Sequence, residues 1–594
     1  MFGERESVMK KNKEEQVEEQ KEEPSGDEKG RSFEVDKKNQ HLYRLEGPVK
    51  ILVSNFNLKI QSQAVLQDEE MPGARSYEIL FRSQSRDVPF AISSDDFLSR
   101  KLQGKVAEVA GSSAILQGPL KDLQIATQQL SGEVPEKIVR SRGLTPDGKY
   151  LCENMIISPS GITTGHTEVI PGNGIYSKNL GFLYPDQSKL IELAKHFNGD
   201  FLELQPHQIT YPLVGHTILA AFATAIRRHW GMDKPGLHLE GPSGSGKTFI
   251  ASRCADCFGD FGGQMPPWKS TPNAIEAQGF QFRDALFVLD DFKASVIPPQ
   301  TAVRVFQGYS GEQGRDRLSP SSRLLKAPYI RGLLLSTGED FVLDTESVTG
   351  RVIRLKVDPK KNLEAGRKCL AWSKEYRMFL PSLIQMVISE PEWEQRAKEL
   401  ITTAVDSYIR ETDGLPNGLR AAGNWALNGL GFTFFLRFLE HLHVLKKTQR
   451  QELWKEYDQI VRDHLKEQSL VLQLDSPVEI FFRVITEKMA LGSICIRGLK
   501  GVDQKVHGKV IGEAKAKEVM LFPDTIMETL FDHYRAVGQR LPFSKNSLRD
   551  ALARDGLISQ SEQGRYSVQF RGHDGLRHQG WSFDRRPFEN LGKV

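Results

Sequence analysis

Residues 236–259 read GLHLEGPSGSGKTFIASRCADCFG, and the architecture of the protein can be worked out from this stretch. A short apolar run typical of a buried strand comes first, then a turn rich in glycine, then a helical pattern. The turn from Gly241 to Thr248 matches G-x-x-x-x-G-K-[ST], in which backbone N–H groups cradle phosphate oxygens. The following helix adds the positive end of its dipole. The stretch therefore predicts a P-loop site for a nucleoside triphosphate, with ATP as the nucleotide.

Two side chains of this turn are expected to act on the nucleotide directly. The Lys247 ammonium would reach the β- and γ-phosphates, and the Thr248 hydroxyl would be a ligand of Mg²⁺. The alternative is a Gly- and Ser-rich surface turn, which the strand–loop–helix context disfavours. The predicted nucleotide-binding residues are Gly241, Pro242, Ser243, Gly244, Ser245, Gly246, Lys247 and Thr248.

A second motif, DALFVLDDF, occupies Asp284 to Phe292. Its apolar residues predict a buried strand that ends in two acids. The first acid, Asp290, would hold the Mg²⁺ shell, and the second, Asp291, would orient or deprotonate the attacking water. A buried strand with a capping aspartate is the alternative, but the phosphate-binding turn upstream favours a metal site.

Two later segments hold further candidates. RGLLLSTGED, at 331–340, is an apolar strand that ends in small polar residues, where a hydroxyl would hydrogen-bond the γ-phosphate or the lytic water. In SVTGRVIRLKV, at 347–357, Arg351 comes just before a strand. In ring ATPases an arginine at this place reaches the γ-phosphate of a neighbouring subunit. An ordinary turn after a strand and a surface arginine are the alternatives.

Candidate nucleic-acid contacts lie in two places. GEQGRDRL, at 311–318, carries Arg315 and Arg317 between glycines, either as a loop that touches phosphate in a central pore or as a solvated turn. Near the C-terminus two helical patterns and a hairpin pattern follow one another, in the order of a winged helix. Lys545, Asn546 and Arg549 would lie near the exposed start of the second helix, which would read DNA or contact a protein.

Composition limits the class of protein. The chain has 594 residues, which at roughly 100–200 residues per domain predicts about three or four domains. No run approaches the roughly 18 apolar residues needed to span a membrane, and the N-terminus has no apolar secretory core. Five cysteines in so long a chain predict a reducing, cytoplasmic location. No residue cluster suggests a primase or a nuclease.

The pattern along the chain predicts a multi-domain α/β protein. Strand and helix patterns are mixed before the phosphate-binding turn, and a long helical region follows the nucleotide-binding part. The expected parts are a disordered charged tail at 1–40, an α+β N-terminal domain at 41–211, a P-loop ATPase core at 212–362, a helical region at 363–492 and a winged-helix-like C-terminal domain at 493–594.

The central stretch, 236–359, resembles a bacterial domain family of unknown function that is found in helicase-like proteins of mobile elements. The blocks that carry the resemblance are EGPSGSGKT, WKSTPNAIEAQG, FRDALFVLDDF, the GRDR loop, LLLSTGED and TGRVIRL. Those proteins are similar to the AAA+ helicases of staphylococcal cassette chromosomes and, more remotely, to superfamily 3 and minichromosome-maintenance helicases.

The resemblance implies an AAA+ fold, a homo-oligomeric ring such as a hexamer, ATP hydrolysis between subunits and translocation on DNA. It puts Thr337 at the sensor position and Arg351 at the finger position. The sequence departs from the usual AAA+ pattern at Asp291, where glutamate is common, and at Ser336-Thr337, where asparagine is common.

Three functions fit these patterns. The first is an ATP-dependent DNA helicase or translocase, expected to serve replication of a mobile element such as a plasmid, a phage or an integrative element. The second is an ATP-gated DNA-binding initiator or regulator without processive unwinding. The third is an ATPase that remodels protein partners. The basic bias of the C-terminal segment favours a DNA partner over a protein partner.

Overall fold

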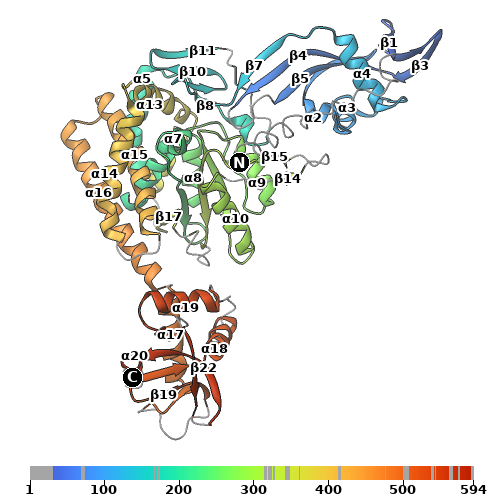
Figure 1. Ribbon diagram of the computed structural model, residues 1–594. Helices are drawn as coiled ribbons and strands as arrows, with labels where there is room; N and C mark the ends of the chain where they lie inside the picture. The colour runs from blue at the N-terminus through green and yellow to red at the C-terminus, as the bar shows by residue number, and fades with distance from the viewer. Residues whose placement is uncertain are drawn as a thin grey trace, which may run out of the picture. The chain divides into compact units, whose positions relative to one another are not determined.

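The structure is a computed structural model that divides into two compact units, Met1–Ser141 with Glu168–Ile170, and Arg142–Thr167 with Pro171–Val594. It describes residues 31–68, 74–165, 168–169, 174–312, 317–318, 324–325, 328–341, 348, 350–359, 362–412, 417–474, 476–499, 508–536, 541, 543–560, 566–572 and 575–589. The protein is a multi-domain α/β protein with mixed sheets and many helices, as the sequence predicts (Figure 1).

A four-stranded parallel sheet forms the centre of the second unit. Its order is β13-β16-β12-β17, with β12 (Gly236–Glu240), β13 (Leu286–Phe292), β16 (Leu333–Gly338) and β17 (Val352–Lys356). The strands are almost wholly buried, which explains why they read as continuous apolar runs. Because the strands are parallel, all of their carboxyl ends meet at one edge, where open α/β sheets bind ligands.

Helices and a small sheet share one hydrophobic core with this central sheet. The core runs from Leu144 to Leu465, so the segments 142–165 and 174–211 pack with the central sheet rather than forming part of a separate N-terminal domain. The small sheet has the order β11-β10-β9-β8, with β8 (Gly143–Leu144), β9 (Tyr150–Cys152), β10 (Met155–Ser158) and β11 (Gly161–Thr164). The helices are α5 (Gln187–His196), α6 (His207–Ala220), α7 (Ala223–Arg228), α8 (Lys247–Ala255), α9 (Pro272–Phe280), α10 (Pro299–Ser310), α12 (Leu363–Ala371), α13 (Phe379–Ile388), α14 (Trp393–Tyr408), α15 (Gly418–His441) and α16 (Lys447–Leu474).

Helices α14, α15 and α16 lie side by side in the predicted helical region (Figure 1). The helix α15 also crosses α6 at very short range, because a Cβ on Gly431 would lie 2.0 Å from the Gly215 carbonyl oxygen. At the same crossing the Asn428 amide donates to the Pro212 carbonyl, 2.8 Å away, and accepts from the Tyr457 hydroxyl at 2.8 Å. The helical region therefore joins the part of the chain that contains the central sheet through close backbone packing.

The first unit is an α+β unit. It has two sheets, with the orders β1-β2-β3 and β6-β5-β4-β7. Its elements are β1 (Ser32–Val35), β2 (Leu42–Glu46), β3 (Val49–Ser54), β4 (Asn57–Gln67), β5 (Arg75–Arg82), β6 (Asp87–Ser93), α2 (Ser94–Phe97), α3 (Lys101–Ala110), α4 (Leu120–Ser131) and β7 (Glu136–Arg140). Strand β1 lies inside the predicted tail because Phe33 is buried in the core of this unit. Residues 1–30 of that tail lie outside the described residues.

The C-terminal part has a hydrophobic core of its own, from Val478 to Phe588. Its sheet has the order β18-β19-β20-β22-β21. The elements are α17 (Pro477–Ala490), β18 (Ile494–Arg497), β19 (Lys509–Ala514), β20 (Glu518–Leu521), α18 (Pro523–Ala536), α19 (Lys545–Arg554), β21 (Ser567–Arg571), β22 (Arg577–Asp584) and α20 (Arg586–Glu589). Because α17 contributes Phe481 and Val484 to this core, the structure moves the predicted boundary from residue 493 to about residue 477.

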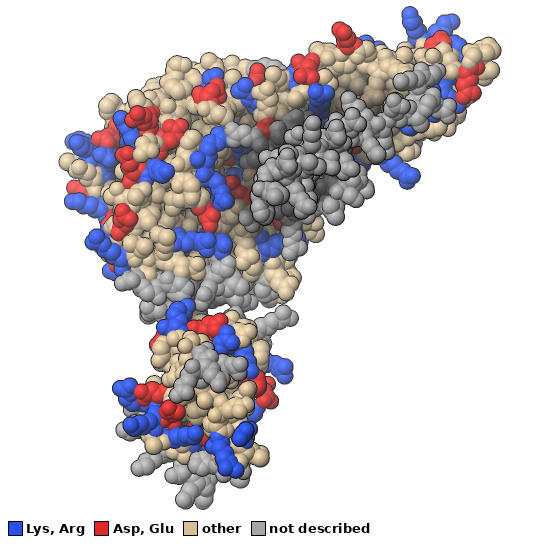
Figure 2. Space-filling model, in the orientation of Figure 1, with Lys and Arg blue, Asp and Glu red and all other residues tan. Residues whose placement is uncertain are grey.

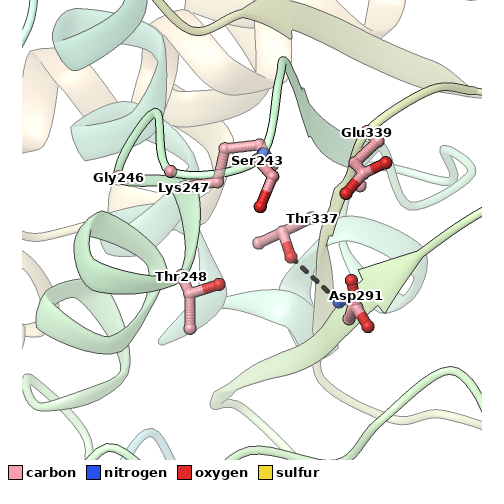
Figure 3. Close-up of a pocket in the computed structure, with 9 residues that line it drawn as sticks. Ser243, Gly246, Lys247, Thr248, Asp291, Thr337 and Glu339 are labelled. Carbon is pink, nitrogen blue, oxygen red and sulfur yellow. Dashed lines mark hydrogen bonds between the residues drawn. The ribbon is translucent and has the colours of Figure 1, made fainter. Parts of the chain in front are cut away.

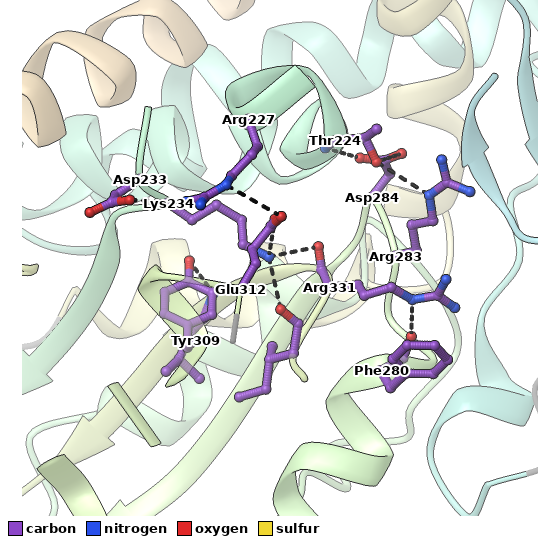
Figure 4. Close-up of polar contacts among 12 residues, drawn as sticks. Thr224, Arg227, Asp233, Lys234, Phe280, Arg283, Asp284, Tyr309, Glu312 and Arg331 are labelled. Atoms are coloured by element: carbon purple, nitrogen blue, oxygen red, sulfur yellow. Dashed lines mark hydrogen bonds and ion pairs between the residues drawn. The ribbon is translucent and has the colours of Figure 1, made fainter. Parts of the chain in front are cut away.

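A buried carboxylate, Asp284, joins three segments of the second unit (Figure 4). It accepts hydrogen bonds from the Leu144 backbone N–H at 2.8 Å, the Thr224 backbone N–H at 2.6 Å and the Thr224 hydroxyl at 2.8 Å. Its own carbonyl accepts from the Tyr150 hydroxyl at 2.6 Å. The chain therefore enters β13 from a fixed point, which also holds the small sheet and α7.

A second buried charge lies just before β12. The Lys234 ammonium donates to the carbonyls of Ile330 and Arg331, at 2.8 and 3.1 Å, and pairs with Glu312 at 3.1 Å (Figure 4). Glu312 lies directly after α10, so this ion pair fixes the end of that helix against the start of the central sheet. In the part of the chain that the structure describes, no helix has the length and apolar character to cross a membrane.

Replacing Asp284 with alanine is expected to destabilise the second unit. The substitution leaves buried N–H and O–H donors without an acceptor, which costs about 3 kcal/mol or more of the free energy of unfolding. Chemical denaturation followed by circular dichroism measures the change. Asp284→Asn is the matched variant, since it keeps one acceptor oxygen and tolerates the φ of +49° at this position; it should lose less stability. Equal stability of Asp284→Ala and the wild type would contradict this role.

Candidate nucleotide-binding site

The loop between β12 and α8 has the backbone of an anion site. Gly244 and Gly246 have φ values of +80° and +95°, which side chains rarely tolerate. Gly246 is also the N-cap of α8, so the loop turns directly into the first turn of that helix. The free N–H groups at a helix start and the helix dipole both favour negative charge at this place.

The Lys247 ammonium lies folded over this loop. It donates to the Gly241 carbonyl at 2.7 Å, to the Pro242 carbonyl at 2.8 Å and to the Ser245 hydroxyl at 3.3 Å. Burial lowers the pKa of Lys247, and the nearby carboxylates, with Glu339 the strongest, oppose this effect. A phosphate entering the loop would offer this ammonium a charged acceptor in place of neutral carbonyls.

The end of β13 departs from regular pairing at its two acids. The register with β16 shifts between Leu289 and Phe292, and Asp291 has a φ of +64°. Asp290 instead pairs with a neighbouring loop, since its N–H donates to the Pro266 carbonyl at 2.9 Å and its carbonyl accepts from the Trp268 N–H at 3.0 Å. Such an irregularity redirects side chains at the end of a strand.

The Asp290 carboxylate joins two hydroxyls from different elements. Its Oδ1 accepts a hydrogen bond from Thr248 Oγ1, at 3.0 Å, and another from Thr337 Oγ1. The Thr337 hydroxyl in turn accepts from the Asp291 backbone N–H at 3.2 Å (Figure 3). Hydroxyl and carboxylate oxygens are the ligands that Mg²⁺ prefers, so Thr248 and Asp290 form a donor pair that fits this ion.

Thr248, Asp291 and Thr337 line a cavity of about 260 Å³ (Figure 3). Glu339 also lines it, although the sequence pattern pointed only to the hydroxyls at the end of this strand. Its position directly after LLLSTG, at the carboxyl end of a buried strand, was the available signal. The lining residues are Ser243, Gly244, Gly246, Lys247, Thr248, Asp291, Thr337, Gly338 and Glu339.

A buried chain of hydrogen bonds holds the carboxyl end of β16 in place. The Trp268 indole N–H donates to the Ser336 hydroxyl, and the Ser336 hydroxyl lies 2.9 Å from His238 Nδ1. His238 Nε2 lies 3.0 Å from the Asp340 carbonyl, which can only accept, so Nε2 carries the proton and Nδ1 accepts from Ser336. Burial lowers the pKa of His238 to about 3, so the ring stays neutral and this order of donors is kept.

Arg351 lies at the opposite edge of the sheet from the loop. It comes just before β17, and its carbonyl accepts from the Gly236 N–H at the start of β12, at 3.0 Å. The loop follows the other end of β12, which at roughly 3.3 Å per residue is about 16 Å away along the strand. Burial and the charge of Arg420 lower the pKa of Arg351, and Asp233 opposes them. Arg351 does not line the cavity of its own chain.

The predicted nucleic-acid contacts are only partly placed. Arg315 lies outside the described residues, and Arg317 lies in the short strand β14 (Arg317–Leu318), which pairs with β15 (Leu324–Leu325). The last two residues of the predicted loop therefore form a strand.

The three C-terminal candidates share the first turns of α19. Lys545 and Asn546 are exposed and Arg549 is half-buried. Lys545 pairs with Asp524 at 2.6 Å, and Arg549 pairs with Asp550 at 2.6 Å. Figure 2 shows Lys and Arg interspersed with Asp and Glu on the visible face of this part.

Comparison with known proteins finds a family whose model matches part of the chain. Residues 152–319 match the family described as "Domain of unknown function (DUF927)". The matched segment contains the loop between β12 and α8 and the strand that ends in Asp290 and Asp291. The predicted resemblance to a family of unknown function is confirmed. No protein of curated function matches the sequence.

The fold is shared with a solved structure titled "SCCmec type IV Cch - active helicase". The two chains are 13% identical, with a TM-score of 0.55, and the match covers 95% of this chain and 99% of that chain. The NrS-1 C-terminal region is 9% identical with a TM-score of 0.27, over 88% of this chain and 96% of that chain. The JCV helicase is 13% identical with a TM-score of 0.20, over 38% and 72%. At these two lower scores the matches say nothing about the fold.

Proposed function

We propose that the chain is an ATP-dependent DNA helicase or translocase with an AAA+ P-loop core, and that it replicates a mobile genetic element. The observation that carries the proposal is the meeting of Lys247, Thr248, Asp290 and Thr337 at the carboxyl ends of parallel strands. These side chains come from three separate segments of the chain. Beside them lies a loop whose glycines Gly244 and Gly246 have positive φ values, which lets the chain turn tightly into α8.

Each residue of the site has a role in hydrolysis. The loop and Lys247 would hold the phosphates. Thr248 and Asp290 would hold Mg²⁺, which would supply positive charge beside the phosphate oxygens. Thr337 orients the Asp290 carboxylate from the neighbouring strand. Asp291 accepts a proton from the attacking water as the water oxygen bonds to the γ-phosphorus. The bond between that phosphorus and the β,γ-bridging oxygen breaks, and ADP leaves with the electron pair.

The position of Arg351 supports hydrolysis between subunits. A guanidinium at the amino edge of the sheet is remote from its own loop but available to a neighbouring copy in a ring. The proposal therefore includes a homo-oligomeric ring, a hexamer, in which Arg351 stabilises negative charge on the neighbour's γ-phosphate. The half-buried position of Arg351 beside Asp233 and Arg420 would hold the guanidinium in place.

DNA is the proposed partner of the hairpin and of the C-terminal part. In the C-terminal part the sheet order β20-β22-β21 and the helices α17, α18 and α19 suit a winged helix, with α19 as the reading helix. Arg315 and Arg317 belong to the segment around β14 and β15, which would contact phosphate. The fold shared with a protein titled as an active helicase supports a motor that acts on DNA.

The Lys247→Ala variant is expected to lose ATP hydrolysis and strand displacement while keeping its fold. Removing one contact to the charge of the transition state typically lowers the rate by roughly 10²–10³. Phosphate release and displacement of a labelled strand from a forked duplex measure the two activities. Lys189→Ala, at an exposed position in α5, is the control and should behave as the wild type. If the unmodified protein hydrolyses ATP but displaces no strand, the result would favour a DNA-binding regulator. If the Lys247→Ala variant hydrolyses ATP as fast as the unmodified protein, the result would exclude the P-loop assignment.

Arg351→Ala tests the ring. The variant should bind ATP but lose hydrolysis almost completely, since arginine fingers contribute roughly 10³–10⁵ in rate. Mixing it with Lys247→Ala protein should restore part of the activity, because a mixed ring joins an intact loop on one subunit to an intact Arg351 on its neighbour. Absence of rescue, with subunit exchange shown by fluorescence energy transfer, would show that Arg351 acts within its own chain or only structurally.

The double variant Lys545→Ala/Arg549→Ala tests the C-terminal contact with DNA. If both side chains meet phosphate, the slope of log K against log salt should fall by about two, roughly one unit for each phosphate that is no longer neutralised. Fluorescence anisotropy at several salt concentrations measures the slope. Arg535→Ala, at a strongly exposed position in α18, is the control. An unchanged slope in the double variant would assign this helix to a protein contact.

A further inference from the structure

Glu339 is a second carboxylate that lines the cavity, beside Asp291. It follows β16 directly and lines the cavity together with Asp291 and Thr337 (Figure 3). Its backbone N–H donates to the Phe292 carbonyl at 3.1 Å, which ties it to the strand that carries Asp291. The next residue, Asp340, accepts from the Ala294 N–H at 2.9 Å and from His238. The backbone that carries Glu339 is therefore held on both sides.

The electrostatics of Lys247 agree with this placement. Burial lowers the pKa of Lys247, and three carboxylates raise it. Of the three, Glu339 has the largest effect, ahead of Asp290 and Asp291. The Glu339 charge therefore acts on the lysine that is proposed to hold the γ-phosphate.

Lys293 links Glu339 to Asp291. Its ammonium lies 3.1 Å from Glu339 Oε1 and 3.6 Å from Asp291 Oδ1. One cation thus bridges two carboxylates that come from neighbouring strands and would otherwise repel each other. All three side chains are about a third exposed or more, and ion pairs of this kind contribute little to stability. Their arrangement at the mouth of the cavity points to a role in the reaction.

We propose that Glu339 is a second water-orienting catalytic residue and that Lys293 positions it together with Asp291; this rests on the proposed ATP hydrolysis. The attacking water has two O–H bonds, and each would point at one carboxylate. The water proton that is hydrogen-bonded to Asp291 transfers to the Asp291 carboxylate as the bond between the water oxygen and the γ-phosphorus forms. The hydrogen bond to Glu339 stays intact and turns a lone pair toward the γ-phosphorus. Holding a reactant in line in this way lowers the barrier without any change in ground-state affinity.

The test compares kcat with nucleotide affinity. Glu339→Ala should lower kcat by about 10²-fold, as expected when one well-placed hydrogen bond is removed, and leave the Kd of a fluorescent ATP analogue unchanged. Glu339→Gln should lose less, since the amide oxygen still accepts a hydrogen bond from water. Asp291→Asn should bind nucleotide and lose hydrolysis, because the amide cannot accept the proton. Glu364→Ala, at an exposed glutamate in α12, is the control and should match the wild type.

Lys293 supplies the second half of the test. Lys293→Met should lower kcat with an unchanged Kd, and Lys293→Arg should restore most of the rate. In the Glu339→Ala background Lys293→Met should have a smaller effect than in the wild type, since the two residues act through one arrangement. Retention of nucleotide affinity by each variant shows that it is folded.

Three results would overturn the inference. The first is a wild-type kcat in Glu339→Ala, and the second is a loss of nucleotide affinity that accounts for its lower rate. The third is a Lys293→Arg variant as slow as Lys293→Met. In each case a wild type that hydrolyses ATP keeps the proposed function intact. A wild type that hydrolyses no nucleoside triphosphate, with or without single-stranded DNA, would overturn both proposals.

Discussion

The hydrogen bonds from Thr248 and Thr337 to the Asp290 carboxylate hold together the site on which every proposed activity relies. They join the first turn of α8 to the ends of two parallel strands. Asp290 reaches this place because its backbone leaves β16 and pairs with the loop at Pro266 and Trp268. In this structure Asp291 lines the cavity, and the Asp290 carboxylate contacts Thr248 and Thr337, which also line it.

Buried polar side chains fix the backbone segments that surround the Asp290 carboxylate. Asp284 fixes the start of β13, and Lys234 fixes the region just before β12. His238, kept neutral by burial, fixes the turn after β16. Each group has partners that would be left as unpaired buried donors or acceptors without it, which is costly in a low-dielectric core. The geometry of the cavity is therefore set by interactions that lie outside it.

The two edges of the central sheet carry different groups of charged residues. The phosphate loop and the acids lie at the carboxyl edge, whereas Arg351, Asp233 and Lys234 lie at the amino edge. Lys234 also holds Glu312, which precedes the segment that carries the β14–β15 hairpin. In the proposed ring, the amino edge of one subunit would face the nucleotide of the next. The Lys234–Glu312 ion pair joins the end of α10 to the start of β12, and the Arg351 carbonyl accepts a hydrogen bond from the first residue of β12.

Local patterns in the sequence were enough to predict the phosphate loop, the two acids and the buried strands: glycines permit positive φ, and apolar runs end in polar residues. Which strands are neighbours came from the tertiary structure. The strand order places Thr337 in hydrogen-bonding contact with Asp290. It also places Glu339 near Asp291, with Lys293 between them. Arg351 lies at the amino edge of the sheet. Tertiary packing also joins the segments 142–165 and 174–211 to the central core and starts the C-terminal core at α17. These features depend on contacts between segments far apart in the chain, which no local pattern records.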